Sequence, residues 1–136
     1  MSDKEALLRN ARKKGRFQAL KVLIEGTEEL TDWTCRVGKD ADYITYGDSC
    51  SKRRMVTYGD RGEGRPLDAD VSHLNNQFGG TFDMTKDQVY ARLKEYLPHA
   101  CKGYGTRDSD YVAIRDEEDA EKFLEFLGSF PGSETR

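Results

Sequence analysis

Three cysteines and two histidines are the first residues to consider as nucleophiles or metal ligands. His99 and Cys101 lie two positions apart, and Cys35 and Cys50 could complete a four-ligand zinc site. Structural zinc sites, however, usually bring their thiolates in close pairs such as CxxC, and the sequence contains no such pair. We therefore expect no bound metal, and we expect no disulfide among the three cysteines.

Nucleophilic catalysis would require a cysteine or serine beside a base that a third group orients. Cys101 with His99 or His73 could be written as such a set, but neighbours on a loop need not face each other. The sequence contains neither a Gly-x-Ser-x-Gly elbow nor an HExxH motif. We therefore expect a protein without enzymatic activity and without a cofactor.

Two glycine-containing segments could hold a phosphate group through their backbone N–H groups. The segment 59–65 carries two acids that would repel phosphate. The segment 102–107 combines positive charge with a ring and a hydroxyl group, which come from Lys102, Tyr104, Thr106 and Arg107. It would suit a small enzyme or a phosphate or nucleotide binder, although glycines are also ordinary in a turn between a helix and a strand.

A stronger functional signal comes from arginines and tyrosines around two similar segments. ITYGD at 44–48 recurs as VTYGD at 56–60, and each is typical of a strand that ends in a Gly-Asp turn. Around this expected hairpin lie residues that would combine charge with aromatic contact area: Tyr46, Arg53, Arg54, Tyr58 and Arg61. Exposed tyrosines beside cations suit a protein interface or, as stacking platforms, single-stranded nucleic acid.

Charge is distributed unevenly along the chain. Residues 1–66 contain 14 Lys and Arg against 11 Asp and Glu, whereas residues 67–136 contain 8 against 14. Five cations fall within eight residues near the N-terminus: Arg9, Arg12, Lys13, Lys14 and Arg16. We expect Arg12 and Lys13 to add long-range attraction for a partner, although cations also complement the C-terminal end of a helix dipole.

The composition limits the class of protein. The chain has 136 residues, of which 36% are hydrophobic and 35% charged, and its mean hydropathy is −0.83. This predicts one soluble domain over 1–136. There is no apolar run of the ~20 residues that span a membrane, and the N-terminus has no secretory signal pattern. Three cysteines without a disulfide framework favour a reducing, cytoplasmic location.

The elements that must position these residues can be read from hydrophobic periodicity. Residues 1–15 predict a basic N-terminal helix that begins with a capping box and ends at Gly15. Residues 17–25 fit either a strand or a helix, and their β-branched content favours a strand. Residues 32–37 predict a half-buried strand with Trp33, Cys35 and Val37 on its inner face, where Cys35 would act as a small buried hydrophobe.

Later segments predict further strands and helices. Strands are expected at 43–46, 54–58 and 111–114, and a helix is expected from Val71 to Phe78. A capping box at 85–88 precedes an apolar stripe that predicts a helix with Val89, Leu93 and Leu97 on its buried face. A last helix begins after Asp116, and the tail at 129–136 is expected to fray.

Strands early in the chain and helices late in it predict an α+β fold. We expect a single antiparallel sheet of about four or five strands, with helices on one face. The favoured function is a non-enzymatic protein-binding module, such as an adaptor, an inhibitor or an immunity-like partner, and nucleic acid is an alternative ligand. Membrane association is not expected.

Overall fold

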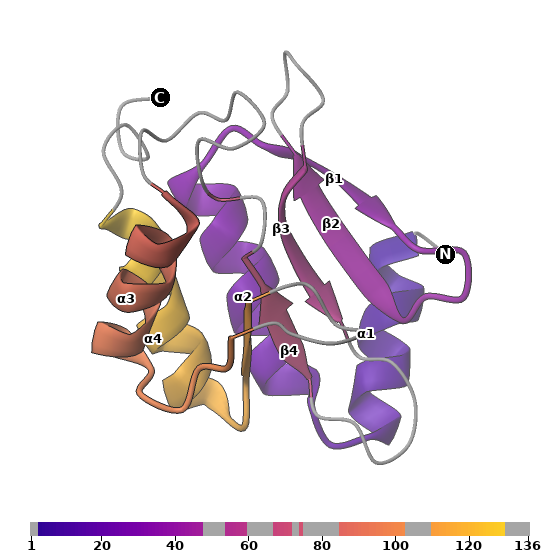
Figure 1. Cartoon of the computed structure of the whole chain (residues 1–136). Coiled ribbons are helices and arrows are strands. Elements are labelled where there is room, and N and C mark those ends of the chain that lie inside the picture. The colour runs from indigo at the N-terminus through magenta and orange to yellow at the C-terminus, as the bar shows by residue number, and fades with distance from the viewer. Residues whose placement is uncertain are drawn as a thin grey trace.

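A computed structural model describes residues 3–47, 54–59, 67–71, 74, 85–102 and 110–129 of the chain. The described elements form an α+β fold, with one five-stranded antiparallel sheet in the order β1-β2-β3-β4-β5 (Figure 1). The expected fold class is therefore confirmed. In chain order the elements are α1 (Asp3–Lys13), α2 (Phe17–Leu30), β1 (Thr34–Val37), β2 (Tyr43–Gly47), β3 (Arg54–Gly59), β4 (Asp68–Asp70), α3 (Lys86–Tyr96), β5 (Tyr111–Ala113) and α4 (Glu117–Gly128).

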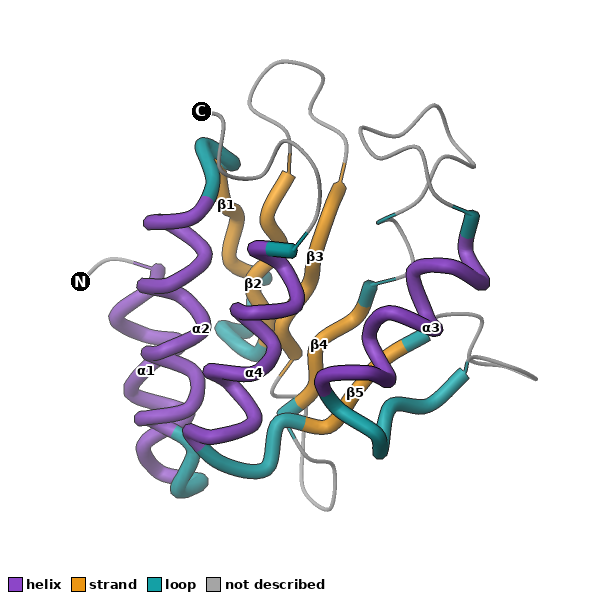
Figure 2. The backbone as a smooth tube through the Cα atoms, turned by 90° about the vertical axis from the view of Figure 1, so that its left-hand side faces the viewer, coloured by secondary structure: helices purple, strands orange, loops and turns teal. Residues whose placement is uncertain are grey.

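The helices lie against one face of the sheet (Figure 2). α2 lies between α1 and α4, and α3 packs against α4 near β5. Alternate residues of the central strands point into the core between the two layers, so that Ile44, Tyr46, Val56 and Tyr58 are all fully buried. No described helix is long and apolar enough to cross a membrane.

The segment 17–25, for which the sequence favoured a strand, is the first part of α2. Its buried residues Leu20, Leu23, Ile24 and Thr27 follow the i, i+3, i+4, i+7 spacing of a helical face. The β-branched residues are accommodated because α2 packs against α1, α4 and the sheet, and such packing overrides local propensity. The strand prediction is wrong because it considered only residues 17–25. The helical spacing becomes clear only when Thr27, beyond that segment, is included.

The first strand is less buried than its sequence pattern suggested. Cys35 was expected as a buried hydrophobe, but its side chain is exposed. Cys35 lies directly opposite buried Tyr46 in the β1–β2 register and shares its face of the sheet. β1 is the edge strand, however, and the helix layer does not cover it at this position. That part of the sequence prediction is corrected.

The segment after residue 66 also differs from expectation. The short strand β4 pairs with β3 and β5, although a three-residue Asp-Ala-Asp sequence gives little strand signal. Val71 and Leu74, which were expected to start a helix, lie outside any helix and are buried beside the sheet. Phe78 lies outside the described residues. β5 joins the sheet at its edge, beside β4.

Several local signals are confirmed. Thr85 and Gln88 form the expected capping box, in which the Gln88 N–H donates to Thr85 Oγ1 at 3.1 Å and the Thr85 N–H donates to Gln88 Oε1 at 2.8 Å. Asp116 accepts from the Asp119 N–H at 2.9 Å and so caps α4. Such caps depend on residues three positions apart, which is why sequence alone identifies them.

Candidate binding surface

The two tyrosines expected on the binding surface are core residues. Tyr46 and Tyr58 are each 0% exposed, and Tyr58 packs edge-on against Tyr46 and Phe123 with ring centroids 6.0 and 5.7 Å apart. Burial raises the pKa of both phenols well above its ordinary value. The prediction that these tyrosines form an exposed stacking surface is therefore wrong.

Their hydroxyl groups are also satisfied internally. The Tyr58 hydroxyl lies 2.7 Å from Thr27 Oγ1 of α2, and the Tyr46 hydroxyl donates to Glu28 Oε2 at 2.9 Å. The same Glu28 oxygen accepts from the Lys4 ammonium at 2.9 Å. Both tyrosines therefore hold the helix layer on the sheet, because each joins a strand to α2.

The arginines of the expected hairpin are only partly placed. Arg54 is the first residue of β3, whereas Arg53 and Arg61 lie outside the described residues. The predicted cluster of arginines around this hairpin therefore stays a prediction, and it now lacks its two tyrosines.

The N-terminal cations, in contrast, lie together on a helical elbow. α1 ends at a Schellman motif, in which the Arg16 N–H donates to Ala11 O at 2.8 Å and the Gly15 N–H donates to Arg12 O at 3.1 Å. Gly15 adopts a φ of +76°, which side chains rarely tolerate. The motif turns the chain back into α2, where Arg12 and Lys21 both lie over the Phe17 ring. We name the cations of this elbow the basic surface: Arg9, Arg12, Lys13, Lys14, Arg16 and Lys21.

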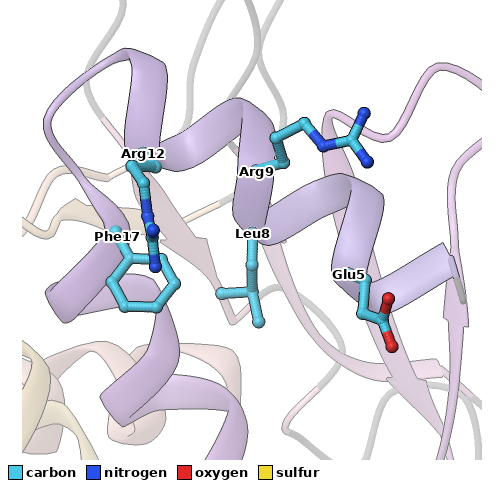
Figure 3. Close-up of a pocket in the computed structure, with 5 residues that line it drawn as sticks. All are labelled: Glu5, Leu8, Arg9, Arg12 and Phe17. Carbon is cyan, nitrogen blue, oxygen red and sulfur yellow. The ribbon is translucent and has the colours of Figure 1, made fainter. Parts of the chain in front are cut away.

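A shallow hollow of about 350 Å³ opens on this basic surface (Figure 3). Its apolar part comes from Leu8 of α1 and Phe17 of α2, both half-buried, and its charged part comes from Glu5, Arg9 and Arg12. The Arg12 guanidinium stacks over the Phe17 ring at 4.1 Å from the centroid, and the Lys21 ammonium lies 5.8 Å from it. The hollow thus combines apolar contact area with positive charge.

Sequence reasoning selected Arg12 and Lys13 but missed Leu8 and Phe17. Phe17 was missed because the sequence analysis favoured a strand at 17–25. A helix at this position brings Phe17 back toward α1. With a helix on each side of Gly15, the chain folds back at the glycine. Arg12, five residues before Phe17, can then stack on the Phe17 ring.

The second candidate ligand site is the segment 102–107. Lys102 forms an ion pair with Asp87 at 2.6 Å, and both side chains are largely exposed. Such surface pairs contribute little to stability. Tyr104, Thr106 and Arg107 lie outside the described residues, so a ligand loop here stays a prediction.

The titratable residues considered for catalysis make mostly structural contacts. His99 Nε2 lies 2.8 Å from Ala113 O and 3.6 Å from Asp119 Oδ2, and the Cys101 thiol lies 3.6 Å from the His99 carbonyl oxygen. Buried Asp119 accepts from the Arg115 N–H at 2.9 Å and from Arg115 Nε at 2.8 Å. These contacts fasten the connection between β5 and α4. Within the described ranges, no three His, Cys, Asp or Glu side chains are grouped to hold a metal.

We expect Asp119→Asn to lower the free energy of unfolding at pH 7 by roughly 1.5–3 kcal/mol, the range for hydrogen bonds to a charged group. Burial alone would raise the pKa of Asp119, but hydrogen bonds from Arg115 outweigh it and lower the pKa below the ordinary 3.8. This stabilisation is present above pH 3.8 and is lost as the pH falls through the lowered folded value.

Urea unfolding at pH 7 and toward pH 2 would measure both effects. The difference between the parent chain and Asp119→Asn should shrink in acid. Glu118→Gln, an exposed neighbour on α4, should change stability little at either pH. A difference for Asp119→Asn that stays constant down to pH 2 would contradict the assigned charge interaction.

A comparison of this chain with protein-family models, characterised proteins and solved structures finds no match.

Proposed function

We propose that this chain is a non-enzymatic protein-binding module whose basic surface binds an acidic surface of another protein. The observation that carries the proposal is the hollow at the α1–α2 elbow, where Leu8 and Phe17 lie among arginines. Arginine and aromatic residues are enriched in protein interfaces, and a central apolar contact with a charged rim is their common arrangement.

Burial of the tyrosines favours a protein partner over single-stranded nucleic acid. Proteins that bind single strands present exposed aromatic faces on which bases stack. Tyr46 and Tyr58 are fully buried, and one face of the Phe17 ring is covered by the Arg12 guanidinium. A protein side chain, in contrast, can pack beside Leu8 and Phe17 without inserting between the stacked groups.

Arg12 and Lys13 have different roles in this proposal. Arg12 is held over Phe17, so its guanidinium loses less side-chain freedom when it pairs with a carboxylate. Lys13 is exposed at the end of α1 and supplies attraction during the approach of an acidic partner. An adaptor, an inhibitor and an immunity-like protein would all act in this way, by covering a partner's surface.

We expect Arg12→Glu with Lys13→Glu to weaken partner binding at least tenfold, through faster dissociation because the Arg12 contact is lost and through slower association because the attraction from Lys13 is lost. The immobilised chain would first capture its partner from nuclease-treated lysate of the source cells, and the purified partner would then be measured by surface plasmon resonance. The matched control is Lys39→Glu with Lys122→Glu, which makes the same charge change at exposed positions away from the hollow. This control should retain most of the affinity.

Two outcomes would contradict the proposal. In the first, nuclease treatment of the lysate abolishes capture, and the chain binds an oligonucleotide. The logarithm of that binding constant then falls by about 0.7 per phosphate contact for each tenfold increase in salt concentration. In the second, the double variant at Arg12 and Lys13, still folded by circular dichroism, binds the purified protein partner as tightly as the parent chain does.

A further inference from the structure

A second hollow is lined mainly by residues of α2 and α4. These two helices lie side by side, on the flank of α2 away from α1 (Figure 2). The second hollow is a shallow, open depression of about 710 Å³, twice the volume of the hollow at the elbow. Its floor is apolar and half-buried, and is formed by Leu30, Tyr96 and Leu124. We name this hollow the acidic groove, because exposed carboxylates stand on both of its sides: Glu29 on α2, and Glu121 and Glu125 on α4.

Two glycines give the groove its shape. Gly26 has no side chain, and a Cβ there would collide with the Leu124 side chain. Leu124 can therefore lie against the α2 backbone, where it forms the floor of the groove. Gly128 is one turn further along α4, and a Cβ there would meet only Leu30, at 3.8 Å. The absence of a side chain at Gly26 thus lets Leu124 approach α2, and its absence at Gly128 leaves room beside Leu30.

The charges around the groove are mainly negative. Glu121 and Glu125 are one helical turn apart and therefore share a face of α4. On the neighbouring α3, Arg92 already donates to Ser129 O at 2.8 Å, at one end of the groove. Lys122 is exposed on α4 but is not among the residues that line the groove. A cationic partner would thus meet carboxylates from two helices.

We infer that the acidic groove binds a basic amphipathic helix of a partner protein. The lining residues of α4 run from Glu121 to Gly128, a rise of about 10 Å, which matches two turns of a docked helix. Apolar side chains spaced i, i+3/i+4 and i+7 would pack on the floor, while lysines or arginines of the docked helix would pair with the glutamates. This surface is separate from the basic surface, so the inference goes beyond the proposed function.

The probe is a synthetic 14-residue peptide of leucine and lysine with helical amphipathic spacing. A scrambled peptide of the same composition, without that spacing, is its control. We expect the amphipathic peptide to bind the chain with a one-to-one stoichiometry by isothermal titration calorimetry, and the scrambled peptide to bind at least tenfold more weakly.

Charge reversal locates the binding site. Glu121→Lys with Glu125→Lys should weaken peptide binding at least tenfold. The matched control, Glu117→Lys with Glu118→Lys, makes the same charge change on exposed residues of the same helix and should change binding less than threefold. Arg12→Glu with Lys13→Glu should not weaken it, so failure here is distinguishable from failure of the proposed function. All variants are first compared by circular dichroism.

Three results would overturn the inference. Equal binding of the scrambled and the amphipathic peptide would indicate only nonspecific attraction to acids. An equal loss of affinity in the two variants with paired glutamate substitutions would place no site at the groove. A dimer of the chain alone in sedimentation, dissociated by Glu121→Lys with Glu125→Lys, would assign the groove to a second copy.

Discussion

Tyr58→Ala is expected to lower the free energy of unfolding by roughly 3–5 kcal/mol, the range for removing a large aromatic side chain from a core. Tyr58 is 0% exposed and lies edge-on to Tyr46 and Phe123, so alanine would leave a cavity between β2, β3 and α4. It would also remove the 2.7 Å contact to Thr27 Oγ1, which joins the sheet to α2. Urea unfolding monitored by circular dichroism measures the loss.

Tyr58→Phe separates the ring from the hydroxyl group. Phenylalanine keeps both ring contacts and should cost about 1 kcal/mol, the net contribution of one hydrogen bond. The Thr27 hydroxyl keeps its own contact with Leu23 O at 2.6 Å. If Tyr58→Ala lowered the free energy of unfolding by less than about 1 kcal/mol, Tyr58 would not be a core residue. The sequence-based prediction that Tyr58 lies on an exposed binding surface would then be favoured again.

Tyr58→Phe should also change how the free energy of unfolding depends on pH under alkaline conditions. Burial raises the folded-state pKa of Tyr58 above its ordinary value of 10.0, so the folded state keeps the proton where the unfolded chain loses it. The stabilisation is therefore complete below pH 10 and declines as the pH rises above it. Tyr58→Phe should make this decline less steep than it is in the parent chain.

Burial of the two tyrosines could have been derived from the sequence. Tyr46 lies two residues after Ile44, and Tyr58 lies two residues after Val56. Since side chains two apart share a face of a strand, each tyrosine must point to the same side as an apolar β-branched residue. The prediction that both tyrosines are exposed rested on the arginines around the hairpin and neglected this alternation. Residue composition alone does not place a tyrosine at the surface.

Features set by near neighbours in sequence were predicted well. The capping box at Thr85, the cap at Asp116 and the glycine stop at Gly15 each involve residues within a few positions of one another. The antiparallel sheet also followed from closely spaced strands. In contrast, β4 was missed because a strand of three residues has almost no pattern, and the sheet around it, not its own sequence, makes it a strand.

The two hollows depend on contacts that the sequence pattern does not contain. Stacking of Arg12 on Phe17 requires α1 and α2 to fold back on each other. The acidic groove brings Leu30 together with Leu124, which is ninety-four positions later in the chain. The sequence shows where the positive and negative residues lie along the chain, because charge counts need no fold. It could not show which apolar side chains lie among those charges.

Leu93→Ala is expected to lower the free energy of unfolding by roughly 2–5 kcal/mol. Leu93 is 0% exposed in the middle of α3, between Val89 and Leu97, which are each 1% exposed. Since alanine favours helix formation as well as leucine does, the expected loss comes from the packing of α3 in the core rather than from the helix itself. Urea unfolding at pH 7 gives the free energy from the midpoint and slope.

Glu95→Ala is the matched control on the same helix. Glu95 is exposed, so its replacement should change stability by no more than about 0.5 kcal/mol in either direction. If Leu93→Ala behaved like Glu95→Ala, α3 would not be packed into the core by its Val89–Leu97 stripe. α3 packs against α4 and contributes Tyr96 to the acidic groove, although Leu93 itself does not line it. A large loss of unfolding free energy in Leu93→Ala should therefore also weaken binding of the amphipathic peptide.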